Sequence, residues 1–448
     1  MRKPLAALLL VLVPALGIVA AAHSPPPPVV LISIDGLRPD YLLRADEYRL
    51  RIPHLRRLLA EGAHATGVLG VLPTLTYPSH TTMVTGVSPM RHGIVANTTF
   101  DPLGRNRGGW YWYAEDIRVP TLWDAAARAG MKTSNVDWPV TVGANITYNI
   151  AQYWRTDVAD APDDAKLGRA LSTPGLLAEA ESHVGPYPSG YAYNVDEDRR
   201  RAAFNVYLLE TRRPRLHLCY LSGLDEEQHR DGPGSPATWA VLEAIDDLVG
   251  RVRTAAEKGG GGRAVVAVVS DHGFARTTRE LELGQALLSA GVTAGGADGG
   301  WKVSIWNCGG SAAIVLKEPR DDRTRDTVAG VLRHLAEAPD SPIDRVLAGD
   351  EARRAGGFPG AAFVVGVKAD TRVGSATDGG PVVRQVRAAG THGFLAANPE
   401  MDGAFLVAGP RIAAGRDLGH IDMRDVAPTL AGILGVPLPT AEGRDVLN

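Results

Sequence analysis

Val29-Val30-Leu31-Ile32-Ser33-Ile34-Asp35 is the stretch that decides the fold of this chain. Its first six residues form an almost wholly apolar run rich in Val and Ile. Such a run is typical of a strand that is buried on both faces, as in a parallel sheet covered by helices. In open α/β sheets ligands bind beyond the carboxyl ends of the strands, so Asp35 is the first candidate site residue.

Apolar runs of the same kind recur along the chain, separated by segments with helical periodicity. Leu216–Leu221 and Val265–Val269 are predicted strands, and residues 52–61, 121–129 and 237–256 are predicted helices. This alternation predicts an α/β fold with a mostly parallel central sheet flanked by helices on both sides.

Two segments depart from this alternation. Residues 281–386 have irregular, Gly-rich connections, which predict a smaller subdomain inserted into the main domain. Residues 1–22 are predicted to be a signal peptide, because Arg2 and Lys3 precede an apolar stretch that ends in three alanines. A membrane anchor is the alternative, but the stretch is shorter than the ~20 residues that span a bilayer. We therefore expect residues 23–448 to be exported, to the periplasm or outside the cell.

Composition narrows the classes of partner. The 448 residues carry 47 Lys and Arg against 50 Asp and Glu, a net charge of −3. No global basic field exists that would attract nucleic acid, and no second long apolar stretch follows the predicted signal peptide. A small-molecule partner is therefore favoured. Cys219 lies in an apolar run and is predicted to be buried; its pairing with Cys308 in a disulfide stays open.

Acidic and imidazole side chains follow the predicted strands. Asp225 and His229 come after one strand, Asp271 and His272 after another, and His392 precedes a further apolar segment. Each alone has an ordinary explanation, such as a helix N-cap or a hydrogen-bonded histidine. With Asp35 they make three Asp and three His at one edge of one sheet. A ligand set without thiolates suits a catalytic pair of zinc ions, although manganese and iron accept the same ligands.

A hydroxyl nucleophile is available nearby. The stretch 73–80 (PTLTYPSH) runs into a segment of helical character at 81–86, which places Thr76 as the predicted N-cap. Capping alone would explain a threonine there. Alternatively, the positive end of the helix dipole favours the alkoxide of Thr76, and a metal would activate it further.

The sequence resembles the nucleotide pyrophosphatase/phosphodiesterase family of the alkaline phosphatase superfamily from about Val29 to the C-terminus. The resemblance rests on seven stretches: 34–41 (IDGLRPDY), 73–80, 89–97 (PMRHGIVAN), 137–139 (DWP), 225–229 (DEEQH), 270–273 (SDHG) and 391–394 (THGF). It implies an alkaline-phosphatase-like catalytic domain over residues 23–448. The sequence departs from the family pattern beside the pocket, at Leu75, Ser79 and Gln228.

The resemblance also implies roles for individual residues. Two zinc ions would be bound, one by Asp225, His229 and His392, the other by Asp35, Asp271, His272 and Thr76. Thr76 would attack phosphorus to form a covalent phosphothreonine intermediate that water then hydrolyses. Asn97 would donate a hydrogen bond to a phosphoryl oxygen, as the family's asparagine does.

The expected substrate is a phosphodiester or a nucleotide. Aromatic residues in the positions of Tyr77 and Tyr220 look like the family's walls around a nucleobase, although Tyr220 could instead fill the core. The aromatic stretch 110–113 could cover the same cleft or pack on itself. Monoesterases place basic groups where this chain has Asp137, and a carboxylate there would repel a dianion, so diesters are favoured. A phosphomonoesterase, a phosphonoacetate-type hydrolase and a non-catalytic secreted binding protein are the alternatives.

Overall fold

The computed structural model describes residues 26–156, 158, 161–191, 193–294 and 300–448. The predicted signal peptide, residues 1–22, lies outside the described residues. Within them, no helix is both long enough and apolar enough to cross a membrane.

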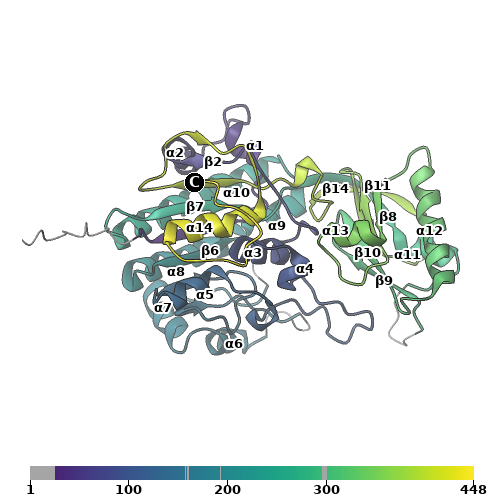
Figure 1. The fold of residues 1–448 in the computed structure, drawn as a ribbon, viewed down its shortest axis with the longest axis horizontal. Coiled ribbons are helices and arrows are strands. Elements are labelled where there is room, and N and C mark those ends of the chain that lie inside the picture. The colour runs from purple at the N-terminus through teal and green to yellow at the C-terminus, as the bar shows by residue number, and fades with distance from the viewer. Residues whose placement is uncertain (1–25, 157, 159–160, 192, 295–299) are drawn as a thin grey trace, which may run out of the picture.

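An eight-stranded sheet forms the centre of the molecule (Figure 1). All neighbouring strands in it are parallel except β15, which runs antiparallel to both of its neighbours, so the predicted fold class is confirmed. In spatial order its strands are β16 (Arg416–Asp417), β2 (Ala63–His64), β15 (Phe405–Ala408), β7 (Val265–Val269), β1 (Val29–Ile34), β6 (Leu216–Leu221), β4 (Thr133–Val136) and β5 (Tyr148–Ile150).

Both faces of this sheet are covered by helices. Along β1, Val29 and Leu31 pack into one hydrophobic cluster, whereas Val30, Ile32 and Ile34 pack into another on the opposite face. This alternation explains why the strand is apolar throughout. The first cluster includes α3 (Thr76–Thr85), α5 (Leu122–Arg128) and α14 (Val426–Leu434). The second includes α1 (Pro39–Leu43), α2 (Pro53–Glu61), α8 (Val195–Arg212) and α10 (Pro236–Gly259).

Shorter elements complete the main body. They are the helices α4 (Pro89–His92), α6 (Asp164–Leu171), α7 (Leu176–Val184) and α9 (Gly223–Asp231), the strands β3 (Gly67–Leu69) and β17 (His420–Asp422), and the 3-10 helices η1 (Ala114–Asp116), η2 (Pro399–Met401) and η3 (Met423–Asp425).

A second group of strands lies to one side of the large sheet, coloured green in Figure 1. Its four-stranded sheet has the order β11-β12-β10-β9, and a three-stranded sheet has the order β13-β8-β14. A separate hydrophobic cluster fills this part. Its elements are β8 (Ala275–Glu282), α11 (Leu283–Ser289), β9 (Val303–Asn307), β10 (Ser311–Leu316), α12 (Asp322–Glu337), β11 (Ile343–Ala348), α13 (Gly349–Arg354), β12 (Phe363–Val367), β13 (Thr371–Gly374) and β14 (Val383–Thr391).

The two cysteines remain free thiols. Cys219 lies in β6 and Cys308 follows β9, and both are buried. The disulfide that the sequence left open is therefore not present, and the interpretation of Cys219 as a buried thiol agrees with the structure.

Candidate active site

The central strands end in the candidate ligands. β7, β1 and β6 are neighbours, and the two pairs are parallel, so their carboxyl ends lie at one edge of the sheet. Asp35 follows β1 directly, Asp271 follows β7, and Asp225 lies in α9, which begins two residues after β6. His392 directly follows β14, so it is contributed by the smaller group of strands.

Three of these side chains form the first candidate metal cluster. Asp35, Asp271 and His272 each offer a ligand atom, and these atoms lie within 4.8 Å of one another. The Nε2 of His272 is 3.3 Å from Oδ1 of Asp35 and 3.3 Å from Oδ2 of Asp271. Tetrahedral ligands bound at 2.0–2.2 Å would be about 3.3–3.6 Å apart, so the spacing suits zinc.

A second cluster shares His272 with the first. Asp225, His272 and His392 offer ligand atoms within 4.8 Å of one another. The Nε2 of His392 is 3.6 Å from Oδ1 of Asp225. His229 is not in this triangle, but its Nε2 lies 3.5 Å from Oδ2 of Asp225, one helical turn away on α9. The structure thus brings together all six Asp and His residues that the sequence singled out.

Hydrogen bonds to the backbone orient the three histidines. The Nδ1 of each ring lies 3.0–3.1 Å from a carbonyl oxygen, and the pairs are His229 with Gly390, His272 with Gly273 and His392 with Thr74. A protonated Nδ1 donates in each case and leaves the lone pair on Nε2, the atom that faces the carboxylates.

Whether a cation fits here can be judged from the hydrogen-bond partners of the buried ligand atoms. Oδ1 of Asp35, Oδ1 of Asp225, Oδ2 of Asp271 and Nε2 of His272 have no hydrogen-bond partner among the described residues. Burial raises the pKa of all three carboxyl groups, and the charge of Asp271 raises the pKa of Asp35 and of Asp225 further. Divalent cations would bind these lone pairs and keep the carboxylates ionised, so the donor set fits a metal pair.

Thr76 lies beside these clusters, but the prediction that it is the N-cap of its helix is wrong. The helix α3 begins at Thr76 itself, and its N-cap is Leu75, whose side chain has no capping oxygen. Leu75 still has extended φ and ψ, so Thr76 is the first residue with helical geometry. Its side chain makes no capping hydrogen bond. It lines the same pocket as Asp35 and Asp225 and is 7% exposed.

Asn97 lines the same pocket with its amide held in place by a hydrogen bond. Its Oδ1 accepts the backbone N–H of Tyr77 at 2.9 Å. The amide nitrogen of Asn97 therefore remains available to donate a hydrogen bond to a ligand in this pocket.

Both predicted aromatic residues line this pocket, a cavity of about 90 Å³. Tyr77 is buried, and its hydroxyl donates to Gln152. Tyr220 is 4% exposed, its ring lies edge-on to His80, and its hydroxyl donates to Oδ2 of Asp35. Tyr220 therefore contacts a candidate metal ligand directly as well as the pocket.

Several pocket residues were missed by sequence reasoning. Trp154, Tyr191 and Tyr193 line the cavity together with Trp110 of the aromatic stretch that the sequence left undecided. Trp154 packs edge-on against the other three rings at 4.9–5.4 Å. The aromatic density of 148–154 and 187–193 is the signal that could have found them.

His80 was also missed. One turn after Thr76, its Nδ1 lies 2.8 Å from the Thr76 carbonyl and 3.5 Å from Oδ2 of Asp271.

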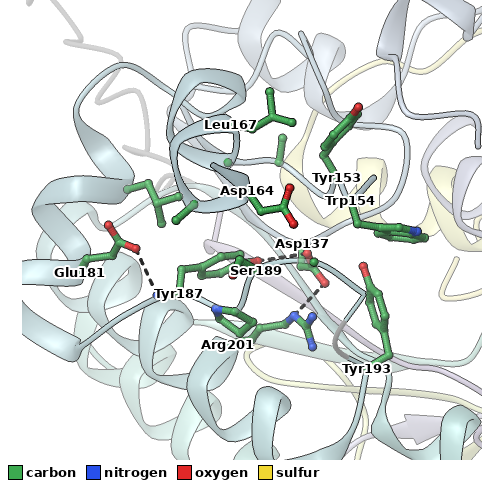
Figure 2. Close-up of a pocket in the computed structure, with 16 residues that line it drawn as sticks. Asp137, Tyr153, Trp154, Asp164, Leu167, Glu181, Tyr187, Ser189, Tyr193 and Arg201 are labelled. Atoms are coloured by element: carbon green, nitrogen blue, oxygen red, sulfur yellow. Dashed lines mark hydrogen bonds and ion pairs between the residues drawn. The ribbon is translucent and has the colours of Figure 1, made fainter. Parts of the chain in front are cut away.

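The argument from Asp137 is wrong. Asp137 is buried, and its carboxylate pairs with Nε of Arg201 at 2.9 Å and accepts a hydrogen bond from Tyr187 (Figure 2). It lines a neighbouring pocket rather than the one with the metal clusters. A basic group does lie beside it, but Arg201 comes from α8, far away in sequence. The charge of Asp137 is therefore compensated and does not act on a substrate.

Known proteins resemble this chain over most of its length. Residues 29–394 match the type I phosphodiesterase/nucleotide pyrophosphatase family. Human ectonucleotide pyrophosphatase/phosphodiesterase family member 5 is 29% identical over 273 residues, 58% of this chain and 48% of that protein. An uncharacterized pyrophosphatase/phosphodiesterase of Schizosaccharomyces pombe is 28% identical over 253 residues, 56% of this chain and 45% of that protein. The chain spans about half the length of these two relatives and a quarter of family member 3 of Rattus norvegicus.

The fold agrees with that match. The structure of murine ectonucleotide pyrophosphatase/phosphodiesterase 5, an inactive form in complex with AMP, aligns with a TM-score of 0.68. The alignment covers 94% of this chain and 99% of that chain at 21% identity. From the family match and the shared fold, this chain belongs to the type I phosphodiesterase/nucleotide pyrophosphatase family.

Proposed function

We propose that this protein is an exported, metal-dependent phosphodiesterase of the nucleotide pyrophosphatase type, with Thr76 as its nucleophile. One observation carries the proposal: the Thr76 hydroxyl and four of the six Asp and His side chains line one pocket, the other two, Asp271 and His272, cluster with them, and buried ligand atoms there lack partners among the described residues. Export rests on the predicted signal peptide.

The residues divide into two sets of ligands. Asp225, His229 and His392 would hold one zinc ion, and Asp35, Asp271 and His272 the other. When bound, the metal pair supplies positive charge for the attacking and leaving oxygens of an in-line displacement.

The chain itself supplies the nucleophile and its orientation. Thr76 lies in the first turn of α3, where the positive end of the helix dipole favours an oxyanion. Its Oγ would attack phosphorus, the P–O bond to the leaving alcohol would break, and a threonyl phosphodiester would form. Water would then cleave the Thr76–phosphorus bond and release a monoester. The amide nitrogen of Asn97 would donate to a non-bridging oxygen throughout.

The charge of the pocket favours diesters. None of the described residues that line it is Lys or Arg. Two zinc ions carry +4 and three aspartates −3, so the site offers about one net positive charge. A diester has one negative charge and a monoester near two, and the second would have no basic side chain to meet it.

Aromatic walls favour a nucleotide as the diester. Rings such as those of Tyr77, Trp110 and Trp154 can stack on a base for about 1–3 kcal/mol. The relatives point the same way, since the murine protein was solved with AMP and human family member 4 is named a bis(5'-adenosyl)-triphosphatase.

Metal removal tests the proposal. A strong chelator should abolish hydrolysis of an aryl phosphodiester, because the carboxylates and imidazoles lose the ions that activate the site. Zinc added back should restore the rate better than magnesium, which prefers oxygen ligands. Full activity in protein shown to be metal-free by elemental analysis would disprove the mechanism.

A further inference from the structure

The helix that carries Asp225 and His229 begins without a cap of its own. The Ser222 side chain, at the N-cap of α9, makes no capping hydrogen bond, and its Oγ has no hydrogen-bond partner among the described residues. The first N–H groups of a helix have no partner within it and need one from outside.

A carboxylate from another helix supplies that partner. Asp198 of α8 is fully buried; its Oδ1 accepts the N–H of Ser222 at 3.1 Å, and its Oδ2 accepts the N–H of Gly223 at 2.7 Å. Its negative charge faces the positive end of the α9 dipole. Both carboxylate oxygens thus hold the first turn of α9, two residues before Asp225.

The contact between the two helices leaves no space. A Cβ atom added to Gly223 would lie 2.7 Å from the backbone nitrogen of Val195 and 2.9 Å from Oδ2 of Asp198. Only glycine at this position lets the backbone of α9 approach the carboxylate closely enough for the 2.7 Å hydrogen bond.

Arg201 connects this cap to the wall of the pocket. Its guanidinium lies between two buried carboxylates, with Nη1 at 3.4 Å from Asp198 and Nε at 2.9 Å from Asp137. It also covers the ring of Tyr193, which lines the candidate active site, at 4.7 Å from the ring centroid. Figure 2, which draws the neighbouring pocket, shows Arg201 next to Asp137, with Tyr193 close by.

We propose that Asp198 and Arg201 are positioning residues that hold α9, and with it Asp225 and His229, in the geometry that binds metal. The inference rests on the proposed function, because it takes those two residues as zinc ligands. Asp198 does not contact the ligand atoms; it acts through the backbone of Ser222 and Gly223. The prediction therefore concerns zinc affinity rather than the chemical step alone.

The chain offers a matched control at Asp246 of α10. This carboxylate is also buried and caps a helix from outside: its Oδ2 accepts the N–H of His54 at 3.0 Å, and its Oδ1 accepts the N–H of Leu55 at 2.7 Å. The helix that it caps, α2, carries none of the proposed ligands. Asp198→Asn and Asp246→Asn thus remove the same kind of cap, at the site and away from it.

The experiment measures zinc binding in the full chain by competition with a chromophoric chelator, alongside melting temperature. Asp198→Asn should lower zinc affinity about 10- to 100-fold, as loss of a group that orients ligands does. Asp246→Asn should lower the melting temperature without changing the zinc affinity of the proposed two-ion site. His54, Asp246 and Asp247 also lie close enough to hold a metal ion, so the stoichiometry of binding is measured to count that site separately. Equal zinc affinity in the two variants would show that Asp198 is only structural.

A second variant covers the case in which Asp198→Asn does not fold. Gly223→Ala keeps every charge and pushes α9 away from Asp198, so it should also weaken zinc binding. Wild-type affinity in folded Gly223→Ala would overturn the inference. Wild-type protein that binds no zinc at all would instead refute the proposed function, so the two failures are distinguishable.

Discussion

Thr76 is a first-turn residue whose hydroxyl contributes little to the stability of its helix. Because it makes no capping hydrogen bond, Thr76→Ala should leave the melting temperature almost unchanged. The same change should lower kcat on an aryl diester by about 10³-fold or more, since a covalent nucleophile is lost. Thr76→Ser should retain part of the activity. Near-normal turnover by folded Thr76→Ala would rule out Thr76 as the nucleophile.

Tyr220 has two separable parts, a ring that borders the pocket and a hydroxyl that contacts Asp35. Burial raises the pKa of Asp35, and the hydrogen bond from Tyr220 opposes that rise, so the hydroxyl favours the ionised ligand. Tyr220→Phe should therefore weaken zinc binding about tenfold or more. It should leave KM for a nucleotide nearly unchanged at saturating zinc.

The comparison variant for Tyr220 is Tyr77→Phe, which also removes a buried pocket hydroxyl but one that donates to Gln152. Zinc affinity should be normal in that variant. If both variants bind zinc equally well, the hydroxyl of Tyr220 does not support the metal site.

Single residues were predictable where their position follows from a strand end. Asp35, Asp225 and Asp271 could be placed together because continuous apolar runs precede them and parallel strands end at one edge. Asp137 could not be interpreted correctly, because its partner Arg201 is 64 positions away on a helix that the strand pattern does not locate. Long-range ion pairs leave no local signal in a sequence.

At the scale of elements, burial determines which strands can be predicted from the sequence. β1, β6 and β7 have the bounds that the apolar runs predict, because each is buried on both faces. The edge strand β16 and its neighbour β2 have only two residues each and leave no such pattern. For α3, the sequence predicted the N-cap at Thr76, one residue after the observed N-cap, Leu75.

The helix α5 shows what an ordinary cap does in this protein. Thr121 forms a capping box with Asp124, in which each side chain accepts the other's backbone N–H. Thr121→Ala should lower the free energy of unfolding by about 1 kcal/mol. The kcat on an aryl diester should not change, since α5 provides none of the described pocket-lining residues. Urea unfolding and initial rates measure the two effects, and a rate loss matching that of Thr76→Ala would contradict this separation.

At the scale of the whole molecule, the smaller group of sheets is connected to the site at both of its ends. It begins with β8, three residues after His272, and its last strand, β14, ends at Thr391, next to His392. The Nδ1 of His392 reaches back to Thr74 of the main body. Placing this ligand therefore depends on how the two parts pack, which the Gly-rich pattern of the sequence could not specify beyond an inserted subdomain.

Substrate choice is the property that the whole pocket determines, and we expect diesters to be preferred. Three carboxylates lie at the candidate metal sites, and two of them, Asp35 and Asp225, line the pocket. The described lining residues also include aromatic rings but no Lys or Arg. A second phosphate charge would thus be poorly neutralised. At saturating zinc, kcat/KM for an aryl phosphodiester should exceed that for the matching aryl monoester at least tenfold, and a nucleotide diester should have a lower KM than a small alkyl diester.

A basic side chain introduced into the lining provides the converse test of that charge argument. Gln152→Lys would place an ammonium group in the pocket, so it should narrow the ratio of diester to monoester kcat/KM by raising the monoester rate. Gln152→Met, of similar length but uncharged, should leave the ratio unchanged. If wild-type protein cleaves monoesters or phosphonates faster than every diester, the charge of the pocket does not select the substrate. The phosphomonoesterase or phosphonoacetate-type alternative would then explain the same ligand set, since both chemistries use a metal pair held by Asp and His.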